Sequence, residues 1–318
     1  MLKNYLEKFD LIEKKYPGKI KDSITFNFNK HKGHLVFSCL IHGNEVGGLP
    51  AFLKIIALLE KKDLQFHGKV TFIIGNKPAS LKNKRFVERD LNRCFHNSLE
   101  LKTWESYRAQ EIKSVVNECD VFFDFHQTTR PCKTPFYIFA MHKNSYLWAR
   151  AVGLSHIFVT RSSTKAFSPE GMCSDEYVRN LNKIGITLEL GEQGLHKNAE
   201  DICFLAMKRS LYLMDEIYLR KKNLSSLAKK NNDFNFLKIC YSEKFDHPQK
   251  RLEEGFVNLQ KISKNMLMGY SISEKAFFAP SDGYILFPQY PNRDSSLIAT
   301  EELSPYIYVL ASKIKKLT

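Results

Sequence analysis

The sequence predicts an α/β protein in which helices flank a largely parallel or mixed sheet, followed by a smaller β-rich domain. Between His34 and about Arg220, short apolar runs alternate with amphipathic helical runs, as in α/β folds. From Lys238 onward helical periodicity is nearly absent, and turn signals recur around residues 281–292. The 318 residues, 43% of them hydrophobic, suffice for one large domain or two. We therefore divide the chain into a domain of residues 1–220 and one of residues 221–318.

The individual elements follow from hydrophobic periodicity. Short apolar runs predict strands at 35–40, 69–75, 121–125, 135–140 and 184–190. Apolar residues at helical spacing predict helices at 49–61, 104–118 and 201–220. Strands that alternate with helices in this way form sheets whose binding sites lie beyond the carboxyl ends of the strands.

Composition narrows the classes of function. The 48 basic and 34 acidic residues give a net charge of +14, which suits nucleic acid, an anionic surface or an acidic substrate. The lysines are diffuse, and the densest tract, residues 220–230, is typical of a solvated linker. No nucleic-acid-binding motif accompanies the charge, so we expect no specific nucleic acid partner.

The first residues and the cysteines indicate a location. Residues 1–17 are rich in charge and lack the apolar core of a secretory signal, and no apolar run is long enough to span a bilayer. The seven cysteines are dispersed without a Cys-x-x-Cys pair, which favours a reducing compartment. We expect a cytoplasmic protein that does not enter a membrane.

Four residues at three predicted strand ends have the chemistry of a zinc hydrolase. His42 and Glu45 follow the strand at 35–40, His126 follows the strand at 121–125, and Glu189 lies at the end of the strand at 184–190. A catalytic zinc ion takes three His or carboxylate ligands and keeps one position open. His42, Glu45 and His126 are the expected ligands of one Zn²⁺ per chain, although other divalent ions suit such a site. Glu189 is left as a separate carboxylate able to accept a proton from water.

A basic segment between these motifs is suited to binding anions. Arg85, Asn92 and Arg93 lie within residues 85–93, and a guanidinium group pairs well with a carboxylate. Asn92 and Arg93 side by side can clamp a carboxylate, and we interpret Lys82, Lys84, Glu88 and Arg89 as solvated.

The motifs together resemble the succinylglutamate desuccinylase/aspartoacylase family, a branch of the zinc carboxypeptidase-like fold. The resemblance rests on four blocks, namely His42-Gly43-Asn44-Glu45, Asp90-Leu91-Asn92-Arg93, Asp124-Phe125-His126 and Thr187-Leu188-Glu189-Leu190-Gly191. It covers about residues 30 to 200, and residues 279–288 resemble the β-rich domain of the same family. The resemblance implies a zinc-carboxypeptidase-like mixed sheet flanked by helices, with a smaller C-terminal β-rich domain.

The resemblance also implies roles for the site residues. His42, Glu45 and His126 would bind zinc, and Glu189 would act as general base and then general acid. Its rival is Glu192, which lies outside the strand-end block. Arg85 would polarise the scissile carbonyl. Substrate carboxylates would be bound by Asn92, Arg93 and Arg179, and also by Arg130 as in desuccinylases. The family tyrosine near the C-terminus is matched by either Tyr306 or Tyr308.

The expected activity is zinc-dependent hydrolysis of an N-acylated acidic amino acid such as N-succinylglutamate or N-acetylaspartate. Arg130 favours the first substrate, whereas Gln127-Thr128-Thr129 is similar to the aspartoacylase version of the loop. A metallocarboxypeptidase acting on peptides would share the ligands and the carboxylate clamp. A non-enzymatic basic nucleic-acid-binding protein would leave the His and Glu residues unexplained. The expected partner is a small acidic N-acyl amino acid, with homo-oligomerisation left open.

Overall fold

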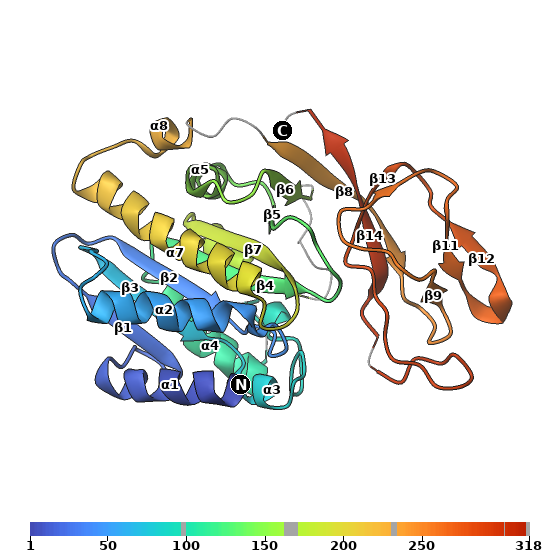
Figure 1. The fold of residues 1–318 in the computed structure, drawn as a ribbon, viewed down its shortest axis with the longest axis horizontal. Coiled ribbons are helices and arrows are strands. Elements are labelled where there is room, and N and C mark those ends of the chain that lie inside the picture. The colour runs from blue at the N-terminus through green and yellow to red at the C-terminus, as the bar shows by residue number, and fades with distance from the viewer. Residues whose placement is uncertain (97–99, 162–170, 230–233, 302, 316–318) are drawn as a thin grey trace.

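The computed structural model describes residues 1–96, 100–161, 171–229, 234–301 and 303–315. An α/β part and a β-rich C-terminal part lie side by side (Figure 1). The helices are α1 (Leu2–Lys15), α2 (Leu49–Glu60), α3 (Lys77–Leu81), α4 (Trp104–Val116), α5 (Lys143–Val152), α6 (Ser174–Asn180), α7 (Lys197–Tyr218) and α8 (Leu224–Ala228). Among the described residues, no helix combines the length and the apolar character needed to cross a membrane.

The strands of the main sheet come from both parts of the chain. From one edge to the other they are β1 (Ser23–Asn27), β3 (Lys69–Ile74), β2 (His34–Cys39), β4 (Val121–Thr128), β7 (Ile184–Glu192), β5 (Phe136–Ile138), β6 (Ile157–Thr160), β8 (Asn235–Lys244), β14 (Tyr306–Ile314), β13 (Gly283–Leu286) and β10 (Lys261–Ile262). Strands β3, β2, β4 and β7 run parallel to one another, whereas β5 is antiparallel to β7. The sheet is therefore mixed, and its central parallel strands end at one edge.

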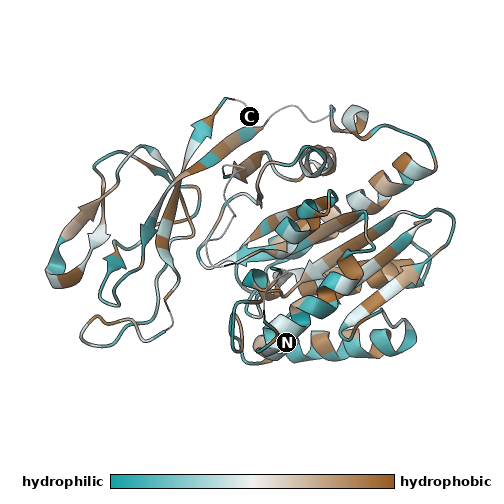
Figure 2. Cartoon of the chain, turned by 180° about the vertical axis from the view of Figure 1, so that it is seen from behind, coloured by the Kyte–Doolittle hydropathy of each residue, from teal (hydrophilic) through white to brown (hydrophobic). Residues whose placement is uncertain are grey.

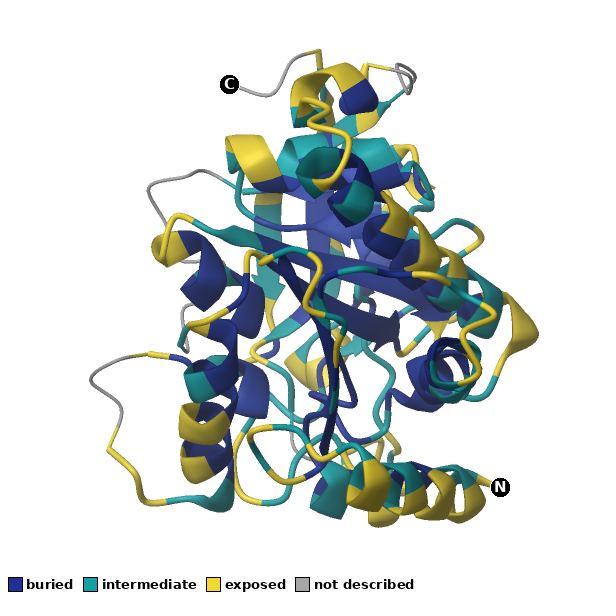
Figure 3. Cartoon of the chain, turned by 90° about the vertical axis from the view of Figure 1, so that its left-hand side faces the viewer, coloured by how far each residue is buried: buried dark blue, intermediate teal, exposed yellow. Residues whose placement is uncertain are grey.

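Helices cover both faces of the parallel strands. One face packs against α1, α2, α5 and α7, and its core includes Phe9, Phe37, Phe52, Phe123 and Trp148. The other face packs against α4 and α6 through residues such as Phe122, Ile112 and Val178. The central strands are apolar (Figure 2), and they are buried between helices whose outer faces are exposed (Figure 3).

The C-terminal part is β-rich, as expected. A small sheet of β12 (Ala276–Phe278), β11 (Leu267–Tyr270) and β9 (Arg251–Leu252) lies beside the main sheet and shares a separate core with β13 and β14. Strand β8 pairs with β6 on one side and with β14 on the other, so the main sheet continues across the expected domain boundary. The division into residues 1–220 and 221–318 stays a prediction.

The α/β fold class predicted from the sequence is confirmed, and the structure adjusts several element boundaries. The predicted strand at 121–125 extends to Thr128, and the strand at 184–190 extends to Glu192. Both strands have hydrogen-bonded neighbours on each side, and this pairing keeps the polar residues at their ends in extended conformation. The helix expected at 201–220 begins one turn earlier, at Lys197. The sequence analysis did not predict α1 or β1.

Candidate metal centre

The turn after β2 presents the first two candidate ligands. The strand ends at Cys39, and Leu40 turns the chain with a φ of 59°. Gly43 then approaches α3 so closely that a Cβ there would lie 2.4 Å from the backbone nitrogen of Ser80. Glu45 is the N-cap residue of a 3-10 helix, Val46–Gly48, that leads directly into α2. The turn therefore holds His42 and Glu45 on a backbone with little freedom to move.

Strand β4 supplies the third candidate ligand. Asp124 and His126 are two residues apart in the strand and point to the same face. His126 is in register with Glu189 on the parallel neighbour β7. Strand pairing thus brings Glu189 beside His126, although 63 positions separate them in the sequence.

The side chains of His42, Glu45 and His126 converge. The two Nδ1 atoms are 3.1 Å apart, Glu45 Oε1 lies 2.8 Å from His42 Nδ1, and Glu45 Oε2 lies 2.9 Å from His126 Nδ1. All three side chains are buried, and each offers one atom to a common point. Two imidazoles and a carboxylate are a ligand set that zinc favours in hydrolases.

The opposite ring nitrogens show how these histidines are oriented. Nε2 of His42 contacts Asp90 Oδ1 at 3.1 Å, and Nε2 of His126 contacts Asp124 Oδ2 at 2.9 Å. Each Nε2 faces a carboxylate that can accept its proton, so a neutral ring in the Nε2–H tautomer presents its Nδ1 lone pair to the cluster. Two such lone pairs and the Glu45 carboxylate, facing one another, form a ligand set that a cation between them would satisfy. The residues present therefore fit a divalent metal ion.

The surrounding charges also favour a cation. Burial lowers the pKa of His126, but the charges of Asp124 and Glu45 outweigh it and raise the pKa overall. Burial raises the pKa of Glu45, yet the two histidines hold it below its usual value. Asp90 is similarly held ionised against burial by Arg85 and His42. The centre therefore combines buried negative charge with basic ring nitrogens.

Glu189 lies beside this cluster without belonging to it. The residue is buried, and among the described residues no hydrogen-bond partner faces its Oε2. Burial raises the pKa of the Glu189 carboxyl to about 8. A carboxyl group that titrates near neutrality is suited to taking up and releasing a proton. Glu192, its rival, is exposed at the end of β7.

Arg85 and the residues around Asn92 are near the cluster. Arg85 donates from Nε and Nη2 to Asp90 Oδ2, at 3.1 and 2.9 Å, and its Nη1 is 3.7 Å from Glu45 Oε1. Asn92 Oδ1 accepts from the backbone N–H of Ser174 at 2.9 Å, which fixes the orientation of its amide. Arg93 donates from Nη1 to the backbone oxygen of Asn92 at 2.9 Å.

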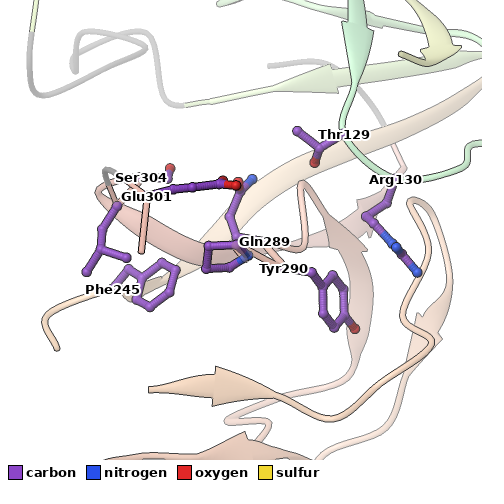
Figure 4. Close-up of a pocket in the computed structure, with 9 residues that line it drawn as sticks. Thr129, Arg130, Phe245, Gln289, Tyr290, Glu301 and Ser304 are labelled. Atoms are coloured by element: carbon purple, nitrogen blue, oxygen red, sulfur yellow. The ribbon is translucent and has the colours of Figure 1, made fainter. Parts of the chain in front are cut away.

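The other two predicted arginines have different surroundings. Arg130 stacks on the Tyr290 ring at 4.6 Å and lines a pocket between the loop after β4 and the C-terminal part (Figure 4). Arg179 is buried on α6, where it pairs with Asp175 and donates to the backbone oxygen of Gly185 at 3.1 Å. Gly185 lies near the start of β7, and Glu189 lies near its end. The Arg179 side chain is thus held within the fold.

The two candidate tyrosines also differ. Tyr308 is fully buried in the core of the C-terminal part. Tyr306 is partly exposed and lies near Arg161. Burial lowers the pKa of Arg161, the nearby Tyr306 raises it, and the charge of Arg93 lowers it. Of the two tyrosines, Tyr306 is therefore the one associated with the arginines of the site region.

The sequence analysis assigned no role to the residues that orient the ligands. Asp124 accepts from Ser38 Oγ at 2.6 Å and from the Ser174 hydroxyl in addition to His126. Asp90 serves His42 and Arg85 together. The Asp-x-His spacing in a strand is a signal for the first carboxylate, since alternate residues share a face. The second carboxylate, Asp90, opens the Asp90-Leu91-Asn92-Arg93 block, but its contact with His42 spans 48 positions and has no local signal.

Known proteins match this chain over the region that contains the candidate metal centre. The family model of the succinylglutamate desuccinylase/aspartoacylase catalytic domain matches residues 32–212. A succinylglutamate desuccinylase of Shewanella pealeana is 27% identical over 239 residues, 65% of this chain and 68% of that protein. A probable aspartoacylase of Nostoc sp. is 32% identical over 209 residues, 60% of this chain and 65% of that protein. These alignments span about two thirds of the relatives' own length.

Solved structures share the fold. The succinylglutamate desuccinylase of Vibrio parahaemolyticus has a TM-score of 0.69 at 18% identity, with 93% of this chain and 87% of that chain covered. Murine aminoacylase 3 has a TM-score of 0.63 at 15% identity, with 89% and 95% covered.

The fold and the matched region define a protein of the desuccinylase and aspartoacylase class. The chain belongs to the succinylglutamate desuccinylase/aspartoacylase family. The names in this family indicate hydrolases that deacylate amino acids.

Proposed function

We propose that the protein is a zinc-dependent amidohydrolase that removes the acyl group from an N-acylated acidic amino acid. The observation that carries the proposal is the convergence of His42 Nδ1, His126 Nδ1 and the Glu45 carboxylate, with both rings held from behind by carboxylates. This arrangement suits a catalytic metal because the ligands are buried and oriented before the ion binds. A zinc ion bound there would supply a Lewis acid and lower the pKa of water.

Glu189 would carry the proton in this reaction. The proposal is supported by the register of β4 with β7, which pairs Glu189 with His126, and by the buried Glu189 Oε2, which has no hydrogen-bond partner among the described residues. The carboxylate would accept a proton from the attacking water and deliver it to the leaving amine nitrogen, because a free amine leaves more readily than an amide anion. The products would be a carboxylic acid and a free amino acid.

Arg85 and the Asn92–Arg93 pair would hold the substrate. Asp90 orients the Arg85 guanidinium through two hydrogen bonds, so its remaining donors can stabilise negative charge on the scissile oxygen. The Asn92 amide uses its oxygen on Ser174, which leaves its NH₂ group as the donor for a carboxylate. An acidic substrate would also be attracted by the net charge of +14.

The choice between substrates depends on Arg130. We propose that Arg130 binds the distal carboxylate of a succinyl group, the role that the resemblance to desuccinylases implies. Its position over the Tyr290 ring, 4.6 Å from the ring centroid in a pocket shared with the C-terminal part, supports a role in binding an anion there. The cytoplasmic location stays a proposal, which the seven free cysteines support.

The test compares deacylation of N-succinylglutamate, N-acetylaspartate and a blocked dipeptide by the same preparation. Activity would be measured as isolated, after removal of metal by a chelator, and after zinc is restored. The proposal predicts chelator-sensitive release of amine from one of the first two substrates. Turnover of the dipeptide alone would favour the metallocarboxypeptidase alternative, and failure to bind any metal would overturn the proposal.

Glu189→Gln and Glu192→Gln form a matched pair for the role of the base. Both carboxylates belong to β7, but only Glu189 is buried beside His126. We expect Glu189→Gln to lower kcat by at least about 10²-fold, in line with the loss of a general base. Glu192→Gln is expected to keep activity near that of the wild type. Equal effects of the two changes would contradict the assignment of Glu189.

A further inference from the structure

The Gln127 side chain connects the segment after β2 to the end of β7, beside the candidate metal centre. Its Oε1 accepts from the backbone N–H of Gly47 at 2.7 Å. Its Nε2 donates to the backbone oxygens of Glu192 and Gly194, at 2.6 and 3.0 Å. Gln127 is buried, so these are hydrogen bonds made away from water.

The backbone of the same residue contacts a candidate ligand directly. The N–H of Gln127 donates to Glu45 Oε2 at 2.9 Å, the oxygen that also faces His126 Nδ1. A displacement of residue 127 would therefore move both His126, its chain neighbour, and the carboxylate of Glu45.

Two glycines that lie near Gln127 in the structure make room for its side chain. A Cβ on Gly47 would lie 2.4 Å from Gln127 Nε2 and 2.7 Å from its Cδ, so the amide occupies space that only glycine leaves open. Gly194, which accepts one of the hydrogen bonds, has a φ of +119°, a conformation that glycine adopts without strain. Two glycines thus accommodate one amide group.

We infer that Gln127 is a positioning residue that sets the distance between the metal ligands and Glu189. It ties the loop of Glu45 to the end of β7, three residues beyond Glu189, across the strand that carries His126. The position interrupts the β4–β7 register, which shifts between His126 and Thr128. At this irregular step, the Gln127 side chain donates to the backbone oxygens of Glu192 and Gly194. The inference rests on the proposed function for its effect on turnover, but not for its effect on metal binding.

Gln127→Met tests the inference because methionine has a similar length and forms none of the three side-chain hydrogen bonds. Asn258→Leu is the matched control. Asn258 is also a buried amide, which donates to the backbone oxygen of Arg130 and accepts from the backbone N–H of Phe287, both away from the ligands. Zinc affinity of the metal-free full-length proteins would be measured by competition with a coloured chelator, and folding by thermal unfolding.

We expect Gln127→Met to weaken zinc binding by about 10- to 100-fold, as is typical when residues that orient ligands are lost. Asn258→Leu should lower the unfolding temperature without changing zinc affinity. Once turnover is established for the wild type, kcat of Gln127→Met should fall at saturating zinc while KM changes little, since the distance to Glu189 is altered and the Asn92–Arg93 pair is not.

Gln127→Glu tests separately the hydrogen bond from Gly47 and the hydrogen bonds to the end of β7. A carboxylate still accepts from Gly47 but cannot donate to Glu192 and Gly194, so we expect a loss of kcat in this variant as well. The inference is overturned if folded Gln127→Met binds zinc as tightly as the wild type, or if Asn258→Leu weakens zinc binding equally. A wild type that binds zinc but deacylates nothing would contradict the proposed function and leave the affinity test of Gln127 intact.

Discussion

Asp124→Asn is the sharpest test of how the ligands are oriented. Asp124 is fully buried and accepts hydrogen bonds from Ser38 at 2.6 Å, from His126 at 2.9 Å and from the Ser174 hydroxyl. An asparagine has the same shape, but one of its two polar atoms is a donor. If the NH₂ group faces His126, the ring must move its proton to Nδ1 or lose a partner.

Either response opposes metal binding. A proton on Nδ1 blocks the atom that faces Glu45 and His42, and a missing partner leaves the ring poorly oriented. A hydrogen bond to a charged group contributes about 1.5–3 kcal/mol. This free energy corresponds to a loss of roughly 10- to 150-fold in metal affinity.

The assay is a chelator competition titration of the metal-free protein at neutral pH, with thermal unfolding as the check on folding. Ser38→Ala is the control, because it removes one donor to Asp124 and leaves the bond to His126. We expect this control to change zinc affinity by no more than about threefold, since its loss is one step further from the ligands. A folded Asp124→Asn protein with unchanged affinity would refute the reasoning.

Two further predictions concern stability, and one concerns the ligand turn. Burial, followed by the charge of Lys69, lowers the pKa of His34 to about 4 from 6.5. Between pH 6.5 and 4 the unfolded chain binds a proton at His34 more tightly than the folded protein does. The contribution of neutral His34 to the free energy of unfolding is therefore complete above pH 6.5, and on the order of 3 kcal/mol of it is lost as the pH falls from 6.5 to 4. The free energy of unfolding, measured with urea at several pH values in this range, should decrease more steeply with falling pH for the wild type than for His34→Gln. Equal pH dependences of the two proteins would contradict the prediction. Phe9→Ala, in the core under α1, should cost about 3–5 kcal/mol by urea unfolding, and a cost below 1 would show that α1 is dispensable. Gly43→Ala should abolish tight zinc binding, because its Cβ would meet backbone atoms of Ala79 and Ser80 that cannot move aside, and retained nanomolar affinity would contradict this.

The apolar elements of the catalytic part could be predicted because each has its own local signal. The runs at 35–40 and 69–75 are predominantly apolar, and they correspond to β2 and β3 within one residue at each end. Strand β4 was predicted too short because its last three residues, His126, Gln127 and Thr128, are polar. What keeps these residues extended is pairing with β2 and β7, and the sequence of β4 alone does not contain that information.

Helix α1 shows the opposite case. The seven charged residues of residues 1–17 were used only to exclude a secretory signal, and no helix was predicted there. Leu6 and Phe9 nevertheless form a buried stripe that packs into the core, while the charged residues lie on the exposed faces. A stripe of one residue per turn is too narrow to stand out from composition, although it is enough to hold a helix on the core.

The residues of the candidate site also differ in whether nearby sequence predicts them or only distant contacts reveal their role. His42, Glu45, His126 and Glu189 were found because each lies at or near the end of a recognisable strand, and the carboxyl ends of parallel strands meet at one edge. Asp90, by contrast, reaches His42 from 48 positions away, and Gln127 reaches Gly47 and Gly194 only because β4 and β7 shift register after His126. Chemistry at a strand end is therefore visible in sequence, whereas the groups that orient it depend on how the loops fold back. Substitutions at Asp90, Asp124 and Gln127 consequently test the structure more directly than substitutions of the ligands, because the contacts by which these residues orient the site come from the structure.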